Sequence, residues 1–251
     1  MSPRYPLLWR LLLPLSAATL RRQRRSFRRE AQACTARLRP PMQILGSENI
    51  PPTGPCLVTV NHYARPGFRA WWIALGISAS LPYEVHWIIT SAWTYPDLLR
   101  RRSLTPATRW ILQRIAARYD FSLMPPMPPD PAEAQARADA VRRVLRYAHS
   151  RPYPVIGLAP EGRDPADGRL GQPPPGVGRF IALLSELGLP ILPVGVYEAP
   201  DRFCLNFGPL YPLELPPGLT PESRDQLSSR QVMLAIARLL PPILQKSEIQ
   251  G

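Results

Sequence analysis

The sequence is poor in the residues that build disulfide or zinc frameworks. Its 251 residues include three cysteines and three histidines. Cys34, Cys56 and Cys204 lie far apart, with no Cys-x-x-Cys pair and no histidine at ligand spacing. We therefore expect no metal site and no disulfide framework, which fits a reducing compartment. The chain also has no Gly-x-Ser-x-Gly segment, which excludes a serine hydrolase of that type.

The N-terminal apolar stretch is too short to cross a bilayer. Residues 5–20 are interrupted by Arg10 and Pro14, whereas a spanning helix needs about 20 apolar residues. A cleaved signal peptide is an alternative, because Arg4 precedes the apolar run. The internal Arg10 and the following segment RRQRRSFRR speak against export.

Positive charge is concentrated at the N-terminus. Residues 1–39 contain ten arginines and one acid, Glu30, so they carry +9 of the net charge of +13. An apolar run followed by an arginine block is typical of a helix that lies in the surface of an anionic membrane. We therefore predict that residues 1–40 form a basic amphipathic segment that is largely helical over residues 5–33 and lies outside the compact body. A solvated basic tail and a nucleic-acid-binding arm are the alternatives.

Strands alternate with helices over the remainder of the chain, residues 41–251. The expected strands are 42–46, 56–60, 84–90, 121–124, 153–159, 191–197 and 203–207. The expected helices are 68–77, 104–119, 130–149, 176–187 and 223–240. This order predicts a single α/β domain with a mostly parallel or mixed sheet flanked by helices.

Two polar segments follow buried strands and are the candidates for chemistry. His62 follows strand 56–60, and residues 160–164 (PEGRD) follow strand 153–159. Because the carboxyl ends of parallel strands meet at one edge of a sheet, we expect His62 and Glu161 to open on one cleft. A histidine that only packs locally, and a surface turn closed by a salt bridge, are the structural alternatives.

Taken together, these segments resemble the glycerol-phosphate and lysophosphatidate acyltransferase family over about residues 42–215. The matching blocks, in order, are residues 46–51 and 54–55, Asn61-His62, Pro160-Glu161-Gly162, residues 189–196 (LPILPVGV) and residues 206–210 (NFGPL). The resemblance implies transfer of a fatty acyl group from acyl-CoA or acyl-carrier protein to a glycerolipid-like hydroxyl. It also implies a peripheral position at the cytoplasmic face of a membrane, with no cofactor beyond the acyl donor.

The resemblance also implies roles for individual residues. His62 would be the base that takes the proton of the acceptor hydroxyl, with Glu161 beside it in the catalytic centre. The residues expected to bind substrate are Asn61, Arg65, Arg69, Gly162 and Arg163. Among these, Arg65 and Arg69 are expected to hold the anionic group of the acceptor.

The sequence departs from the family pattern at the position that supports the histidine. The first family block is Asn-His-x4-Asp, in which the aspartate orients and charges the histidine, and Gly67 stands at the aspartate position. Fast catalysis then requires another carboxylate at His62, for which Glu161 is the first candidate, ahead of Glu84 and Asp164. The alternative is a catalytically lapsed relative that binds lipid or an acyl partner. A carboxylate bonded to the His62 ring would favour the enzyme.

Overall fold

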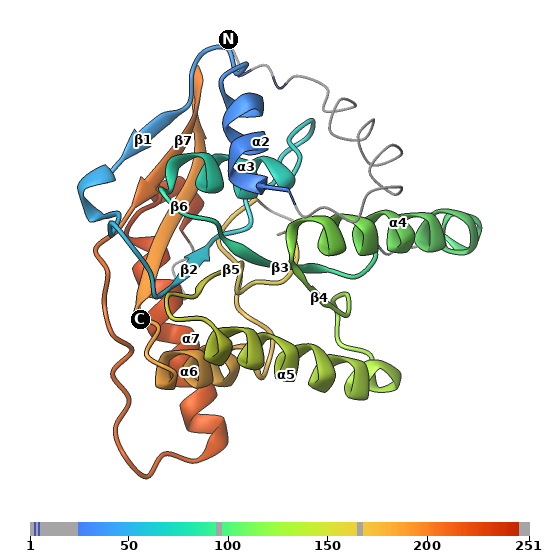
Figure 1. Cartoon of the computed structure of the whole chain (residues 1–251), viewed down its shortest axis with the longest axis vertical. Helices are drawn as coiled ribbons and strands as arrows, with labels where there is room; N and C mark the ends of the chain where they lie inside the picture. The colour runs from blue at the N-terminus through green and yellow to red at the C-terminus, as the bar shows by residue number, and fades with distance from the viewer. Residues whose placement is uncertain (1–2, 4, 6–24, 94–96, 165–167, 246–251) are drawn as a thin grey trace.

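A single sheet organises the part of the chain that the computed structural model describes, which is residues 3, 5, 25–93, 97–164 and 168–245 (Figure 1). Its strand order is β1-β7-β6-β2-β5-β3-β4. The strands are β1 (Gln43–Leu45), β2 (Cys56–Val60), β3 (His86–Thr90), β4 (Ser122–Met124), β5 (Val155–Leu158), β6 (Ile191–Ala199) and β7 (Arg202–Phe207). Neighbouring strands are parallel except β6 and β7, which pair antiparallel. The predicted α/β fold with a mostly parallel sheet is confirmed.

Helices connect the strands and cover both faces of the sheet (Figure 1). They are α2 (Phe27–Thr35), α3 (Trp71–Ser80), α4 (Leu98–Tyr119), α5 (Ala134–Ser150), α6 (Val177–Glu186) and α7 (Pro221–Ala237). Short 3-10 turns are η1 (Ser47–Asn49), η2 (Pro131–Glu133) and η3 (Pro242–Leu244). Side-chain caps fix where the helical segments begin: Asp130 accepts the Ala132 N–H and Thr220 accepts the Ser223 N–H.

The central strand β2 is buried on both faces, which explains its continuous apolar sequence. Successive side chains of a strand point to opposite faces of the sheet. Cys56, Val58 and Val60 accordingly pack with α2 and α3, whereas Leu57 packs with α5, α6 and α7. The sheet is therefore the middle of three layers, and the carboxyl end of β2 emerges between the two helical layers.

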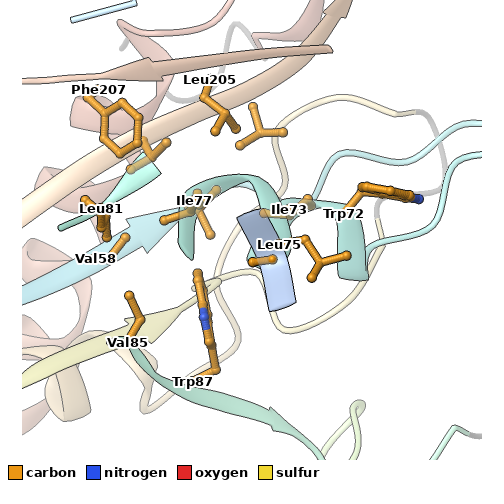
Figure 2. Packing of buried hydrophobic residues seen from close by; sticks show 14 of the residues in the cluster. Val58, Trp72, Ile73, Leu75, Ile77, Leu81, Val85, Trp87, Leu205 and Phe207 are labelled. Carbon is orange, nitrogen blue, oxygen red and sulfur yellow. The ribbon is translucent and has the colours of Figure 1, made fainter. Parts of the chain in front are cut away.

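Helix α3 is apolar on nearly every side because it lies between the sheet and α2. Figure 2 shows Ile77 of α3 close to Val58 of β2. Trp72 and Leu75 of α3 belong to the same buried cluster as Phe207 of β7. The helix begins at residue 71, three residues after the predicted start. The preceding residues form a turn instead, in which the Phe68 N–H donates to the Arg65 carbonyl oxygen at 3.1 Å.

The N-terminal region contributes to the packed body. Phe27, Ala31 and Cys34 lie on one face of α2 and pack into the core beside α3, with Ala31 completely buried. The Tyr5 ring packs against Phe68, with ring centroids 5.4 Å apart. The prediction that residues 5–33 lie outside the body is therefore wrong at Tyr5 and in α2. The membrane-surface helix predicted over the rest of this segment falls on residues 6–24, outside the described residues.

None of the described helices is long and apolar enough to span a membrane.

Candidate active site

The structure brings the two polar segments together at the carboxyl edge of the sheet. β2 and β5 are parallel neighbours with Thr59 opposite Leu158, so the residues that follow them emerge side by side. The His62 backbone N–H donates to Glu161 Oε2 at 2.5 Å. The shared edge was predicted from the strand pattern, whereas the cleft expected there stays a prediction.

The carboxylate at the His62 ring belongs to Asp164. His62 Nδ1 lies 3.2 Å from Asp164 Oδ1, and the side chains are 22% and 61% exposed, respectively. The prediction of Glu161 as the ring partner is wrong, because Glu161 contacts the His62 backbone. A turn after β5 explains the difference. Gly162 adopts φ +67° and its N–H donates to the Ala159 carbonyl oxygen at 3.1 Å, which folds Asp164 back toward the ring.

Glu84, which was also predicted as a possible partner of His62, lies at the opposite end of the fold. It accepts hydrogen bonds from the Ser26 hydroxyl and the Arg28 backbone N–H at the start of α2. It precedes β3 and therefore lies at the amino edge of the sheet, away from His62.

The buried carboxylate of Glu161 links two loops through hydrogen bonds. Only 3% of the residue is exposed, and its carboxylate accepts the N–H groups of His62 and Gly171, each at 2.5 Å. Burial raises the pKa of Glu161 to about 7, although both N–H donors favour the charged form. Glu161 therefore fixes the backbone that carries the His62 ring.

This raised pKa predicts a stability that depends on pH. Because the folded-state pKa exceeds the usual 4.5, the contribution of Glu161 to stability is full below pH 4.5 and is lost as the pH rises through about 7. Relative to Glu161→Gln, wild type is expected to lose about 2–3 kcal/mol of unfolding free energy between pH 5 and pH 8, at 1.36 kcal/mol per pKa unit.

Urea unfolding at both pH values measures this difference. Glu214→Gln, at an exposed glutamate, is the matched control and should follow wild type. An identical pH dependence in wild type and Glu161→Gln would contradict the assignment.

Asn61 joins two strands and is not available to a substrate. The residue is 3% exposed, its Nδ2 donates to the Val196 carbonyl oxygen at 2.9 Å, and its Oδ1 accepts the Val196 N–H at 2.7 Å. The amide thus continues the pairing of β2 with β6 beyond the end of β2. The substrate-binding role predicted for Asn61 is corrected to a structural one, in which it holds the segment that begins with His62.

Arg65 is likewise engaged inside the protein. Its Nε and Nη2 donate to both carboxylate oxygens of Glu198, which also accepts the hydroxyls of Tyr5 and Tyr63. Burial opposes the charge on Glu198, but the Arg65 guanidinium and the Tyr5 hydroxyl hold its pKa below the usual value. The predicted anion-binding role of Arg65 is therefore corrected, because a buried carboxylate already neutralises its charge.

The remaining predicted substrate residues lie at the surface. Arg163 is exposed directly beside Asp164 in the chain, and Arg69 is exposed with its guanidinium carbon 5.9 Å from the Trp71 ring centroid. Gly162 shapes the turn between Glu161 and Asp164.

Neither a protein-family model nor a curated protein sequence matches the chain. Among solved structures, it is similar to the 1-acyl-sn-glycerophosphate (LPA) acyltransferase PlsC from Thermotoga maritima, with a TM-score of 0.53 and 15% sequence identity. The similarity covers 85% of this chain and 78% of the other. The chain therefore shares the fold of this acyltransferase.

Within this acyltransferase fold, Gly67 occupies a turn that suits no other residue well. Its φ of +84° is in the left-handed region, and a Cβ added there would lie 3.4 Å from Arg65 Nη1. Gly67→Asp is therefore expected to destabilise the protein by about 1 kcal/mol and to compete with Glu198 for Arg65. Because Asp164 already serves the His62 ring, we expect no gain in any His62-dependent activity.

Thermal unfolding and activity measurements on Gly67→Asp test this expectation. Gly218→Asp is the control, since Gly218 has a similar φ of +77° with no atom within 4 Å of an added Cβ. A large gain in activity in Gly67→Asp would show that the Asp164 carboxylate does not support the His62 ring.

A cavity lies at the opposite edge of the fold. It measures about 500 Å³, and its lining includes residues 83–86, before and at the start of β3, and residues 151–153 and 155, around the start of β5. These are the amino ends of the strands, so the cavity is separate from His62.

Cys34, Cys56 and Cys204 are free thiols. Among the described residues, no group of three or more histidine, cysteine or acidic side chains is arranged to hold a metal ion.

Proposed function

We propose that this protein is an O-acyltransferase that moves a fatty acyl group from acyl-CoA or acyl-carrier protein to the hydroxyl of a glycerolipid-like acceptor. The observation that carries the proposal is the contact between His62 Nδ1 and Asp164 Oδ1 at 3.2 Å, at the carboxyl edge of an acyltransferase fold. Asp164, in the loop after the neighbouring strand β5, would replace the carboxylate that the sequence lacks at Gly67. This pairing supports an active enzyme over a lapsed relative.

The reaction follows from the chemistry of an imidazole held by a carboxylate. Asp164 accepts the Nδ1–H of His62, so Nε2 keeps a lone pair for the proton of the acceptor hydroxyl. As His62 takes this proton, the hydroxyl oxygen bonds to the thioester carbonyl carbon. The carbon–sulfur bond then breaks, and the thiolate leaves with the proton from the imidazolium. Asp164 stabilises the imidazolium while the proton resides on it.

Rigid backbone positions the reacting ring. Glu161 holds the His62 N–H, and Asn61 holds the preceding residue against β6. In this role Glu161 is a positioning residue, and the base is His62. Arg163 is the closest exposed cation to this pair along the chain, and we assign it to the anionic group of the acceptor, with Arg69 as a second contact.

We also propose that the protein acts at a membrane surface. Residues 6–24 would hold the protein peripherally on an anionic membrane at its cytoplasmic face, where both the acyl donor and the glycerolipid acceptor are within reach. No cofactor other than the acyl donor enters the mechanism.

The test is an acyl-transfer assay with the purified full chain. Acyl-CoA and acyl-carrier protein are offered with lysophosphatidate or a neutral glyceride, and ester product and free thiol are measured together. The proposal predicts equal amounts of ester and thiol that both depend on the acceptor. Binding of lysolipid without any ester formation would favour the lapsed relative.

A further inference from the structure

Three of the tryptophans in the described part of the chain are exposed to solvent. Among the tryptophans that the structure describes, Trp72 and Trp87 are 1% and 4% exposed, but Trp71 and Trp93 are each 42% exposed and Trp110 is 54% exposed. Trp71 and Trp93 lie side by side, and contiguous apolar side chains exposed to water commonly mark a binding surface.

These tryptophans border helix α4. The rings of Trp71 and Trp93 lie 6.3 Å apart, and the Trp93 backbone N–H donates to Thr108 Oγ1 of α4 at 3.2 Å. Leu104, one turn before Thr108, is 43% exposed. Trp110 is two residues after the buried Thr108, which turns it by about 200° to the outward side of the helix. Figure 1 shows α4 projecting from the side of the body.

Helix α4 is strongly cationic. Its 22 residues include six arginines and no acidic residue. Arg102 and Arg109 are exposed, and the Arg114 guanidinium carbon lies 4.2 Å from the Trp110 ring centroid. Arg69 stands near the Trp71 ring in the same way, at 5.9 Å.

The combination of exposed tryptophans and arginines complements a surface that is anionic outside and apolar beneath. Tryptophan is favoured at membrane interfaces because its ring is amphipathic, and arginine binds anionic headgroups while its stem packs on apolar groups. A nucleic acid would satisfy the charges but would leave Leu104 in water. An anionic phospholipid bilayer satisfies both.

We propose that α4, together with Trp71 and Trp93, is a membrane-docking surface for anionic phospholipid, separate from the N-terminal arginine block. His62 follows β2, Asp164 follows β5 and Trp93 follows β3, and these are three consecutive strands of the sheet. Docking would therefore bring the His62 edge of the sheet to the lipid headgroups. This consequence rests on the proposed function, whereas docking itself does not.

The first experiment is co-sedimentation of the full chain with vesicles of phosphatidylglycerol and phosphatidylcholine. The triple variant Arg102→Gln, Arg109→Gln and Arg114→Gln is compared with Arg142→Gln, Arg143→Gln and Arg146→Gln, which removes the same charge from exposed positions of α5. At about fivefold per charge at the membrane surface, the α4 variant should bind at least tenfold more weakly than the α5 variant. Equal losses in the two variants would overturn the proposal.

The second experiment locates the tryptophans, in the full chain carrying Trp9→Phe. Brominated phospholipids in the same vesicles quench tryptophan fluorescence at the interface. We expect strong quenching that disappears when Trp71, Trp93 and Trp110 are all replaced by Phe. Quenching that persists in this variant, or a lack of quenching in bound protein, would overturn the proposal. Preference for a single-stranded oligonucleotide over the vesicles would overturn it too.

The two proposals fail in distinguishable ways. With a water-soluble, short-chain acceptor, the α4 variant should retain the activity of wild type, because its changes lie away from His62 and Asp164. With acceptor in anionic vesicles, its activity should fall in proportion to binding. Equal activities of the α4 variant and wild type in the vesicle assay would contradict docking, whereas a wild type inactive in both assays would contradict only the proposed reaction.

Discussion

Replacing His62 with alanine is expected to lower the rate of acyl transfer by about 10²–10⁴-fold, the usual contribution of a positioned general base. Without the imidazole, the acceptor hydroxyl must lose its proton to water as it attacks the thioester. The loss should appear mainly in kcat, since the ring acts on the reacting oxygen and not on the acyl chain. Steady-state rates at saturating donor and acceptor measure the effect.

The fold should tolerate this change. Alanine keeps the backbone N–H that Glu161 accepts, and the ring itself contacts an exposed carboxylate. His149→Ala is the matched control, because His149 is exposed in the last turn of α5. Rates for His62→Ala equal to those of His149→Ala would remove His62 from the mechanism.

Replacing Asp164 with asparagine is expected to lower kcat by about 10–10²-fold while KM changes little. The amide cannot stabilise the imidazolium that forms as His62 takes the proton. In the serine-protease triad the corresponding change costs about 10⁴-fold. We expect less here because Asp164 is 61% exposed, and water and salt screen its charge.

Asp201→Asn is the control for this variant, since Asp201 has a half-exposed side chain paired with Arg202 in the turn between β6 and β7. Comparing kcat and KM of both variants separates a defect in proton transfer from a defect in binding. A change confined to KM would move Asp164 from the histidine to the substrate.

The architecture was predictable because it follows from local patterns. The run CLVTV predicted the central strand with the bounds that β2 has, and each later strand and helix lies within a few residues of its expected range, apart from the six-residue difference at the start of α4. Parallel strands on neighbouring positions place their following residues at one edge, so His62 and Glu161 could be brought together from the sequence.

The contacts within the site depend on features that the strand pattern does not contain. Glu161 and Asp164 are three residues apart on one loop, and the left-handed turn at Gly162 decides which carboxylate meets the ring. In the sequence Arg65 has no acidic residue near it. Its partner Glu198 lies 133 residues further along the chain, and only the fold brings the two together. An acidic residue two positions after a strand-ending Pro-Glu-Gly turn is the signal that could have pointed to Asp164.

Which tryptophans are buried and which are exposed could not be predicted from the sequence either. Trp71 and Trp72 are adjacent, yet the helix turns one into the core and the other into solvent. Trp110 sits within an apolar-looking stretch of α4, but the buried face of that helix is set by Thr108, Leu112 and Ala116.

The most direct test of the central claim, that His62 and Asp164 act as one catalytic unit, is a double-mutant cycle on the rate of acyl transfer. Wild type, His62→Ala, Asp164→Asn and the double variant are assayed under the same conditions with the same donor and acceptor. If Asp164 acts through His62, Asp164→Asn should lower the rate in wild type but have no further effect once His62 is alanine. An equal fold loss from Asp164→Asn in both backgrounds, or a wild type no faster than His62→Ala, would contradict the claim.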